Sequence, residues 1–267
     1  MNLQDSRILL TGAGSGIGRC LALQLASRGA KLALVGRNRA KLDAVANETG
    51  GSHVFVFDLS GPSGQEELAS GIVEALGDID MLVNNAGVME FCDFSRQDAG
   101  SIDRLIRTNL TGPLLLTHAV LPFLLRKNSG KIVNVGSTFG SIGFGHFAVY
   151  SATKFALRGF SESLRRELDH TRIGVLYAAP RATKTALNEE AVVELNRRTG
   201  IMMDEPEYAA REIVSAIETD ASECYIGWPE KAYARLNAVF PRVVDKALEK
   251  NNKIARELLK CRQGISK

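Results

Sequence analysis

The feature that most constrains the fold is a regular alternation of short apolar runs with helix-like stretches. Each run is rich in Val, Ile and Leu and ends in Gly, Pro or polar residues, as strands buried on both faces do. The runs cover residues 7–12, 31–37, 53–58, 80–87, 130–137 and 172–180. Amphipathic stretches separate them at 16–28, 39–49, 63–76, 100–127 and 149–169. This alternation predicts βαβ units, right-handed crossovers and a parallel sheet.

We therefore expect an α/β fold, a Rossmann-type doubly wound three-layer sandwich. Its sheet should have seven mostly parallel strands in the order 3-2-1-4-5-6-7, the last one near residues 223–228. A TIM barrel ranks second, because it would show eight such units and no glycine-rich first turn. Without a repeat or a linker, residues 1–267 read as one domain. A loop with helices at about 181–205 and a basic helical extension at about 229–262 complete it.

Composition and scattered cysteines indicate a soluble protein of a reducing compartment. Hydrophobic residues make up 45% and charged residues 24% of the chain. Cys20, Cys92, Cys224 and Cys261 are far apart in sequence and do not cluster with histidines, so we expect free thiols and no metal site. The first residues show no basic stretch followed by a long apolar run, which predicts a cytoplasmic location.

A glycine-rich turn joins the first strand to the first helix. In TGAGSGIG, Gly12 allows a tight turn, Gly16 lets the backbone approach a pyrophosphate, and Gly18 lets the helix pack close to the sheet. Phosphates would meet the free N–H groups of this turn, including those near Ser15 and Ile17, and the positive end of the helix dipole. The spacing is G-x-x-x-G-x-G, which differs from the usual GxGxxG.

Four polar residues further along the chain complete a recognisable pattern. Tyr150 and Lys154 share one face of a helix, Ser137 ends the fifth strand, and Asn109 lies in a long helix that it suits poorly. Together with TGxxxGxG, they resemble the classical branch of the short-chain dehydrogenase/reductase family over roughly residues 5–185. The resemblance implies a catalytic tetrad of Asn109, Ser137, Tyr150 and Lys154.

The chemistry of carbonyl reduction explains these residue types. Hydride arriving at a carbonyl carbon builds negative charge on the oxygen, which needs a proton and a hydrogen-bond donor. Tyr150 would supply the proton, Ser137 would donate to the oxygen, and the Lys154 ammonium would lower the pKa of Tyr150. By resemblance, Lys154 also holds the nicotinamide ribose, and Asn109 positions a water that links Lys154 to solvent.

The end of the second strand predicts the cofactor. A carboxylate there would hold the ribose 2′-hydroxyl of NAD, but LVGRNR has Gly36 followed by Arg37. Arg37 suits a 2′-phosphate, so we expect NADP(H) in preference to NAD(H). By resemblance, the other cofactor-binding residues on this side are Asp58, Leu59, Asn85, Ala86 and Gly87.

The segment after the sixth strand departs from the family pattern. Pro180 and Thr185 of PRATKT match residues beside the nicotinamide carboxamide, and Thr183 could share the role of Thr185. Arg181 stands where the family has glycine. It either faces solvent or contacts a substrate or phosphate group.

Aromatic residues and the basic tail suggest the substrate side. Phe139, Phe144, His146 and Phe147 precede Tyr150 and suggest a wall for an apolar or lipid-like substrate. His146 is either a second acid or base or, in the reading we favour, a pocket-lining or hydrogen-bonded histidine.

Residues 231–267 hold ten Lys/Arg and three Asp/Glu, a net charge of +7 against −4 for the remainder. We favour a dimer-forming or cleft-covering tail over a peripheral membrane contact, although both stay open. Its apolar set is Leu236, Val239, Phe240, Val243, Val244, Ala247 and Leu248.

The function expected from these features is NADP(H)-dependent interconversion of a secondary alcohol and a ketone. We expect a homodimer or homotetramer with a small-molecule substrate and no nucleic acid partner, because the basic tail lacks interleaved aromatics. The alternative is a cofactor-binding scaffold or sensor with little turnover. Retention of both Tyr150 and Lys154 argues against it.

Overall fold

The computed structural model describes residues 1–228 and 230–262, and it contains one seven-stranded sheet. All neighbouring strands pair in parallel in the order β3-β2-β1-β4-β5-β6-β7, which confirms the predicted fold. The strands are β1 (Arg7–Thr11), β2 (Lys31–Gly36), β3 (His53–Val56), β4 (Met81–Asn84), β5 (Gly130–Val135), β6 (Ile173–Ala179) and β7 (Glu223–Tyr225). Residues 229 and 263–267 of the predicted domain lie outside the described residues.

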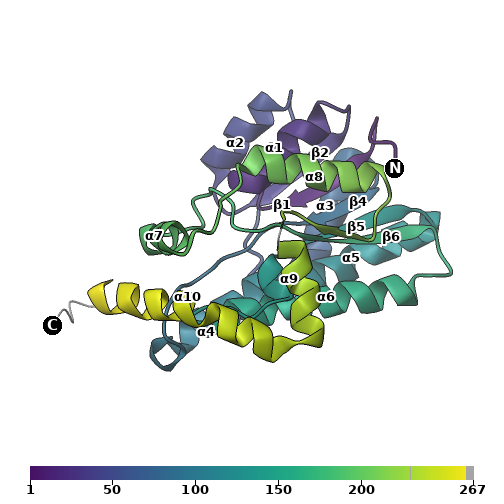
Figure 1. Cartoon of the computed structure of the whole chain (residues 1–267). Coiled ribbons are helices and arrows are strands. Elements are labelled where there is room, and N and C mark those ends of the chain that lie inside the picture. Colours follow the sequence, from purple (N-terminus) through teal and green to yellow (C-terminus); the bar gives the residue numbers. More distant parts are fainter. Residues whose placement is uncertain (229, 263–267) are drawn as a thin grey trace.

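Helices cover both faces of the sheet (Figure 1). One layer holds α1 (Gly16–Ala26), α2 (Arg39–Glu48) and α8 (Pro206–Glu218). The opposite layer holds α3 (Gln65–Leu76), α4 (Ala99–Ile106), α5 (Gly112–Lys127) and α6 (Ala148–Glu167). Three further helices lie beyond the sheet: α7 (Glu190–Thr199), α9 (Glu230–Val239) and α10 (Pro241–Arg262).

Alternation along the strands assigns their side chains to the two layers. In β1, Ile8 and Leu10 pack with α1 and α8, whereas Leu9 packs with α3 and α5. All three side chains are buried, which explains why the run is apolar without interruption. The sheet is therefore the middle layer of a three-layer sandwich.

The predicted helix at 100–127 is interrupted by one wide turn. Residues Arg107–Thr111 form a π turn between α4 and α5, closed by a hydrogen bond from the Gly112 amide to the Arg107 carbonyl. A Cβ at Gly112 would lie 2.5 Å from the Leu59 carbonyl oxygen, so this close approach requires glycine. Asn109 lies inside the turn, which accounts for a poor helix former at that position.

By length and hydropathy, the helical stretch Ala99–Lys127, taken with its π turn, could cross a membrane. Half of its most apolar window is buried inside the protein, however, and α5 packs against α3 and the sheet. Burial of this kind is typical of a core helix in a globular fold.

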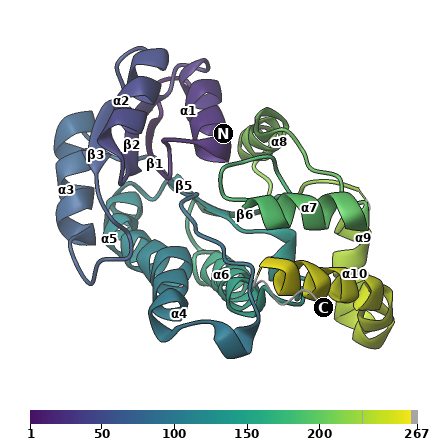
Figure 2. The same ribbon diagram turned by 90° about the vertical axis from the view of Figure 1, so that its left-hand side faces the viewer.

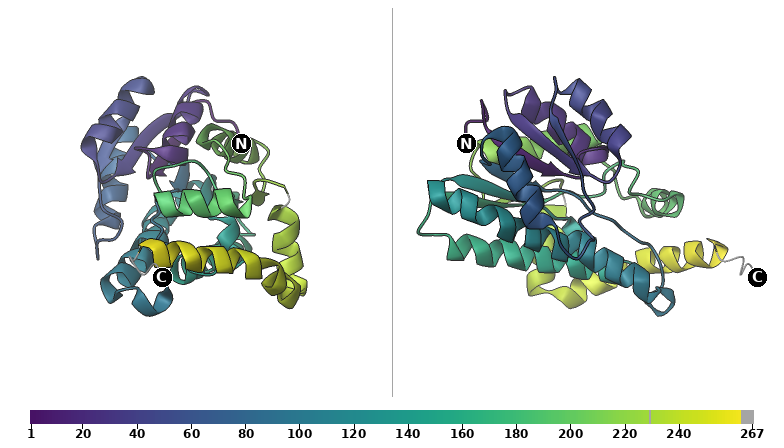
Figure 3. Two further views of the ribbon diagram at one scale, coloured as in Figure 1. Left: turned by 60° about the vertical axis from the view of Figure 1, so that its left-hand side comes forward. Right: turned by 180° about the vertical axis from the view of Figure 1, so that it is seen from behind.

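The C-terminal helices fold back over one side of the domain. Helix α10 lies beside α7 (Figures 2 and 3), and Ile254, Ala255 and Leu259 of α10 pack against Val192 and Leu195 of α7. The position of α10 thus matches a cleft-covering element.

The apolar set predicted for the tail divides into buried and exposed members. Val244 is buried and Leu248 is partly buried, but Val239, Phe240 and Val243 are more than half exposed. The exposed members cluster where α9 meets α10, at residues 239–243.

Candidate active site

The glycine turn has the tight geometry predicted for it. Gly12 has φ +66°, and a Cβ there would lie 2.8 Å from the Ala86 Cα. A Cβ at Gly18 would lie 2.1 Å from the Gly12 carbonyl oxygen, so α1 packs directly on the turn. Because Ser15, the N-cap of α1, makes no capping bond with its side chain, amide groups at this helix start are available to an anion.

Asn85 ties this turn to the neighbouring strand. Its Nδ2 donates to the carbonyl oxygens of Thr11 and Gly12 at 3.0 and 3.3 Å. The Thr11 hydroxyl accepts hydrogen bonds from the amides of Asn85 and Ala86. The NNAG segment therefore fixes the turn from the side, which agrees with its predicted position.

Asp58 and Arg37 lie together at the far end of the site. The Asp58 Oδ1 accepts from the amide and hydroxyl of Ser60 at 2.9 and 2.7 Å. Burial opposes ionisation of Asp58, but the Ser60 hydrogen bonds and the Arg37 charge outweigh it and lower the pKa of the carboxyl. Sequence reasoning missed Asn38 and Lys41, which line the site beside Arg37, although an Asn capping the helix after β2 signals that position.

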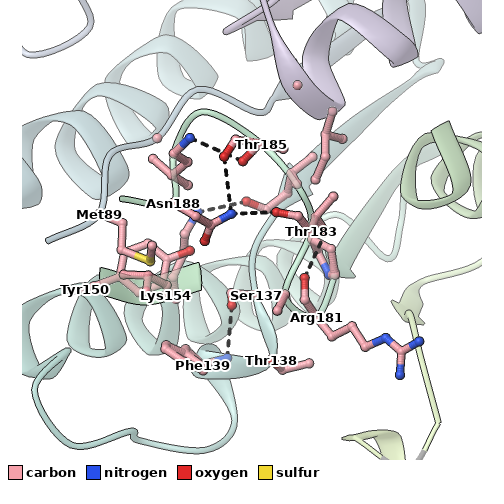
Figure 4. Close-up of a pocket in the computed structure, with 18 of the residues that line it drawn as sticks. Met89, Ser137, Thr138, Phe139, Tyr150, Lys154, Arg181, Thr183, Thr185 and Asn188 are labelled. Atoms are coloured by element: carbon pink, nitrogen blue, oxygen red, sulfur yellow. Dashed lines mark hydrogen bonds between the residues drawn. The ribbon is translucent and has the colours of Figure 1, made fainter. Parts of the chain in front are cut away.

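Ser137, Tyr150 and Lys154 come together in the middle of the site (Figure 4). The Ser137 hydroxyl lies close enough to the Tyr150 phenol to affect its pKa, and the Ser137 Oγ accepts a hydrogen bond from the Phe139 amide at 3.1 Å. The Lys154 Nζ lies 5.7 Å from the centre of the Tyr150 ring. Lys154 is buried, and its Nζ donates to the Val135 carbonyl at 3.1 Å.

Burial controls the ionisation of this pair. It raises the pKa of Tyr150 to about 12, against the opposing effect of the neighbouring Ser137 hydroxyl. It also lowers the pKa of Lys154 to about 8. Desolvation dominates at both groups, and the Lys154 Nζ donates to a backbone carbonyl, so the effect of Lys154 on the pKa of Tyr150 stays a prediction for the cofactor-bound site.

Asn109 is held by the backbone that follows β4. Its Oδ1 accepts from the Val88 amide and its Nδ2 donates to the Val88 carbonyl, both at 2.8 Å. Nδ2 also donates to the Thr153 hydroxyl at 3.2 Å. A Cβ at Gly87 would touch both the Asn109 Oδ1 and the Lys154 Nζ, so the two polar groups flank one glycine. The water that Asn109 is predicted to position stays a prediction.

The segment after β6 reaches back to the glycine turn. The side chain of Thr185 would lie 3.0 Å from a Cβ at Gly16, whereas Thr183 is buried and donates to the Arg181 carbonyl. Asn188 donates to the carbonyls of Thr183 and Thr185. Both threonines line the same cavity as the glycine turn, and their place beside the nicotinamide carboxamide stays a prediction.

Arg181 does not face solvent, and its contact with a substrate or phosphate group stays a prediction, since the residue lines the cavity. Its guanidinium points away from Ser137, Tyr150 and Lys154 (Figure 4) and forms a largely buried ion pair with Asp204. Among the described residues, Arg181 is not one of those with positive φ, so replacing glycine costs no backbone strain.

The aromatic wall is present, but His146 is not part of it. Phe139 and Phe144 stack with ring centres 5.3 Å apart, and Phe147 contacts both edge-on. His146 instead pairs with Asp93 through Nδ1 at 2.8 Å and is absent from the described residues that line the site. The favoured reading of a hydrogen-bonded histidine holds, whereas its predicted place in the wall is wrong.

One cavity of about 990 Å³ contains all of these parts. It runs from Arg37 past the glycine turn to Tyr150 and the aromatic wall. Every predicted cofactor-binding residue lines it, and among the predicted catalytic residues only Asn109 does not, although its neighbour Thr108 does. Sequence reasoning missed residues contributed by distant elements, namely Met89, Thr108, Ile142, Val192, Leu195, Asn196, Ile201, Met202 and Tyr233.

The cavity suits a dinucleotide at its polar end. A left-handed glycine turn, a helix N-terminus and a basic side chain line this end and form what we call the dinucleotide cradle. A side chain at Gly12 or Gly18 would collide with the backbone of Ala86 or of the turn itself, so the turn requires glycine at both positions.

Comparisons with known proteins agree with this geometry. The chain is 33% identical over 258 residues to the uncharacterized oxidoreductase YxnA of Bacillus subtilis, covering 93% of this chain and 72% of the relative. It is 32% identical over 227 residues to the 3-oxoacyl-(acyl-carrier-protein) reductase FabG of Escherichia coli, covering 84% and 92%.

Solved structures show the same fold. A short-chain dehydrogenase from Streptomyces avermitilis superposes with a TM-score of 0.79 at 27% identity, over 96% of this chain and 99% of the other. A short-chain dehydrogenase/reductase from Burkholderia phymatum, solved in complex with NAD, gives a TM-score of 0.82 at 24% identity, over 91% and 96%. The pattern of short chain dehydrogenases matches residues 6–196, and the chain therefore belongs to this family of oxidoreductases.

Proposed function

We propose that this protein is an NADP(H)-dependent oxidoreductase that interconverts a secondary alcohol and a ketone. The observation that carries the proposal is the position of the neighbouring Ser137–Tyr150 pair. It lies between the dinucleotide cradle and the apolar wall of the same cavity. A carbonyl group at this point would face a proton donor on one side and the cofactor end on the other.

Each of the four predicted catalytic residues has a distinct role in carbonyl reduction. The bound nicotinamide supplies the hydride. Tyr150 delivers a proton to the developing alkoxide, and its raised pKa keeps the phenol protonated at neutral pH. Ser137 donates a hydrogen bond to the same oxygen, and Lys154 would hold the nicotinamide ribose hydroxyls. Asn109 would position the water that connects Lys154 to solvent.

The preference for NADP(H) rests on the charge at the end of β2. Arg37 and Lys41 both line the adenosine end of the cavity, where a carboxylate after β2 would favour NAD(H). Two cations provide partners for a 2′-phosphate, and the position after Val35 is a glycine that cannot repel it.

An apolar, lipid-like substrate fits the other end. Beyond Tyr150 the wall is built from phenylalanines and from aliphatic residues of α7 and α10, including Leu195, Val244 and Leu248. Burial of apolar substrate surface against this lining is favourable, and the lining offers few polar groups to a hydrophilic substrate.

The competing proposal is a scaffold or sensor that binds cofactor without meaningful turnover. Reduction of a panel of ketones with NADPH and NADH would exclude it. The sharper test is Tyr150→Phe, which should abolish reduction while NADPH still binds, since the phenol hydroxyl donates the proton. Retained activity in this variant would remove the assigned role.

We further propose that the protein is cytoplasmic and that two or four copies associate. The support for association is an apolar pocket on α4 and α6, lined by Phe94, Ile102, Ile106, Leu110, Ala148, Val149, Ala152 and Thr153. Phe94 and Ile106 are exposed there, as expected of a surface that a second copy covers. Light scattering of the wild type and of Ile106→Glu would test this.

We also propose that an anionic membrane surface is a second binding partner of the protein, contacted by its C-terminal tail. Exposed Val239, Phe240 and Val243 stand beside exposed Arg242 and Lys246 where α9 meets α10. Apolar side chains flanked by cations suit an anionic lipid surface.

A further inference from the structure

The ion pair between Arg181 and Asp204 is the most enclosed cation–anion contact near the site. Arg181 Nε and Nη2 donate to the two Asp204 carboxylate oxygens at 2.8 and 2.7 Å. The side chains are only 11% and 10% exposed. This two-pronged geometry is specific to arginine and is only weakly screened by salt.

Asp204 also closes the chain on itself through its backbone. Its amide donates to the Ala182 carbonyl, and its carbonyl accepts from the Lys184 amide, both at 2.8 Å. A β-bridge between Thr183 and Asp204 results. The ion pair and these bonds close residues 182–203 into a loop with a fixed base.

This loop carries parts of both halves of the site. Near its start, Thr185 lies against the glycine turn at Gly16. Further along is α7, whose Val192 and Leu195 line the cavity and pack under α10. A shift at the base of the loop would therefore move the cofactor side and the substrate wall together.

Arg181 makes a further contact outside this loop. Its Nη1 donates to the Trp228 carbonyl at 3.3 Å, just before α9. Helix α9 contributes Tyr233 and Leu236 to the cavity lining. One guanidinium thus joins the loop that carries α7 to the segment that leads into α9.

We propose that Arg181 and Asp204 form a positioning pair that aligns the substrate wall with the cofactor cradle. The inference rests on the proposed function and deepens it. The Arg181 guanidinium points away from Ser137, Tyr150 and Lys154 (Figure 4), so we assign the pair a positioning role. The pair sets where Thr185 and α7 lie, and so controls affinity for cofactor and for ketone more than the chemical step itself.

The test compares Arg181→Lys and Asp204→Asn with the wild type. Arg181→Lys keeps the charge but loses the two-pronged contact, and Asp204→Asn leaves the arginine with a neutral partner. Glu205→Gln is the matched control, because Glu205 pairs with Lys184 in the same segment and both are exposed. Adding Asp204→Glu to Arg181→Lys lengthens the acidic arm and should restore part of the contact.

The fluorescence of NADPH itself changes when the dinucleotide leaves water for a binding site, so titration with each protein measures its dissociation constant. For both single variants we expect the NADPH dissociation constant and the ketone KM to rise about tenfold, with kcat falling less. Glu205→Gln should stay within about twofold of the wild type for both quantities. The Arg181→Lys/Asp204→Glu protein should recover part of the loss. A purely structural pair would lower the melting temperature and leave KM unchanged.

The proposal is overturned if folded Arg181→Lys keeps both constants within about twofold of the wild type. Should Asp204→Asn fail to fold, Arg181→Lys decides alone. If the wild type binds neither NADPH nor NADH, the proposed function fails. Trypsin cleavage at Lys184 and Arg197 inside the loop then tests the pair, and unchanged cleavage rates in Arg181→Lys reject it.

Discussion

The hydroxyl of Tyr177 donates to the Ser137 backbone carbonyl at 3.1 Å and accepts from the Ser137 amide at 3.4 Å. Tyr177 belongs to β6, so the end of β5 is held by its neighbour in the sheet. A Cβ at Gly136 would lie 2.3 Å from the tyrosine, and glycine is therefore required there. The Ser137 side chain owes its position beside Tyr150 to this support.

Replacing Tyr177 with phenylalanine should slow the reaction without weakening cofactor binding. The change keeps the buried ring and removes a hydroxyl that fixes the Ser137 backbone. Loss of roughly 1 kcal/mol of hydrogen bonding predicts a fall in kcat of about fivefold. Steady-state kinetics with NADPH titration measures this. Tyr225→Phe is the control, since its hydroxyl contacts Ser141 instead. Equal effects of both changes would contradict the assignment.

Removing the Arg37 side chain should change cofactor choice. Arg37→Ala removes a cation from the adenosine end, so the NADPH dissociation constant should rise by about tenfold or more. NADH lacks the 2′-phosphate, and its dissociation constant should change by no more than about twofold. Arg39→Ala is the control, because Arg39 is exposed and lies near Asp43. Parallel losses for both cofactors would remove the argument for NADP(H).

The parts of the fold that repeat along the chain could be predicted. Apolar runs at 7–12 and 130–137 mark strands because burial on both faces leaves no place for polar residues. The glycine turn could also be predicted, because the positive φ of Gly12 and the close contact at Gly18 exclude any residue with a side chain. These requirements are local, so the sequence displays them directly.

Contacts between distant segments could not be predicted in this way. No spacing rule links Arg181 to Asp204, which are joined only because the loop between them returns to its start. His146 was placed in the aromatic wall from its neighbours, yet its positive φ turns it toward Asp93. The ionisation of Tyr150 likewise depends on how deeply the fold buries it.

Replacing Lys154 with methionine should stabilise the protein at neutral pH. Burial lowers the pKa of Lys154 from 10.5 to about 8, so the folded state disfavours its charge. The charged lysine therefore lowers the free energy of unfolding. This loss of stability is full below pH 8, decreases as the pH rises from 8 to 10.5, and is zero above pH 10.5. At pH 7, Lys154→Met should raise the free energy of unfolding by on the order of 1–2 kcal/mol, after the lost bond to Val135.

Urea unfolding of both proteins between pH 7 and pH 10 measures this difference. The advantage of Lys154→Met should diminish over that range, because the wild type gains stability as its lysine loses the proton. Lys184→Met is the control, since the Lys184 side chain is exposed and its replacement should show no such trend. A variant less stable than the wild type at pH 7 would contradict a desolvated Lys154.

The last prediction concerns the junction of α9 and α10. If exposed Phe240 and Val243 insert into an anionic lipid surface, Phe240→Ser/Val243→Ser should reduce co-sedimentation with phosphatidylserine vesicles by about tenfold or more. Both changes keep α10 and its contacts with α7, which removal of the tail would destroy. Leu125→Ser is the control, because Leu125 is an exposed leucine of α5. Neutral vesicles should retain less of the wild type, because the cations Arg242 and Lys246 lose their partners. Equal sedimentation of the wild type and both variants would contradict a lipid contact at this surface. The surface would then be assigned to association with a second copy of the chain, and light scattering of the same variants would measure that association.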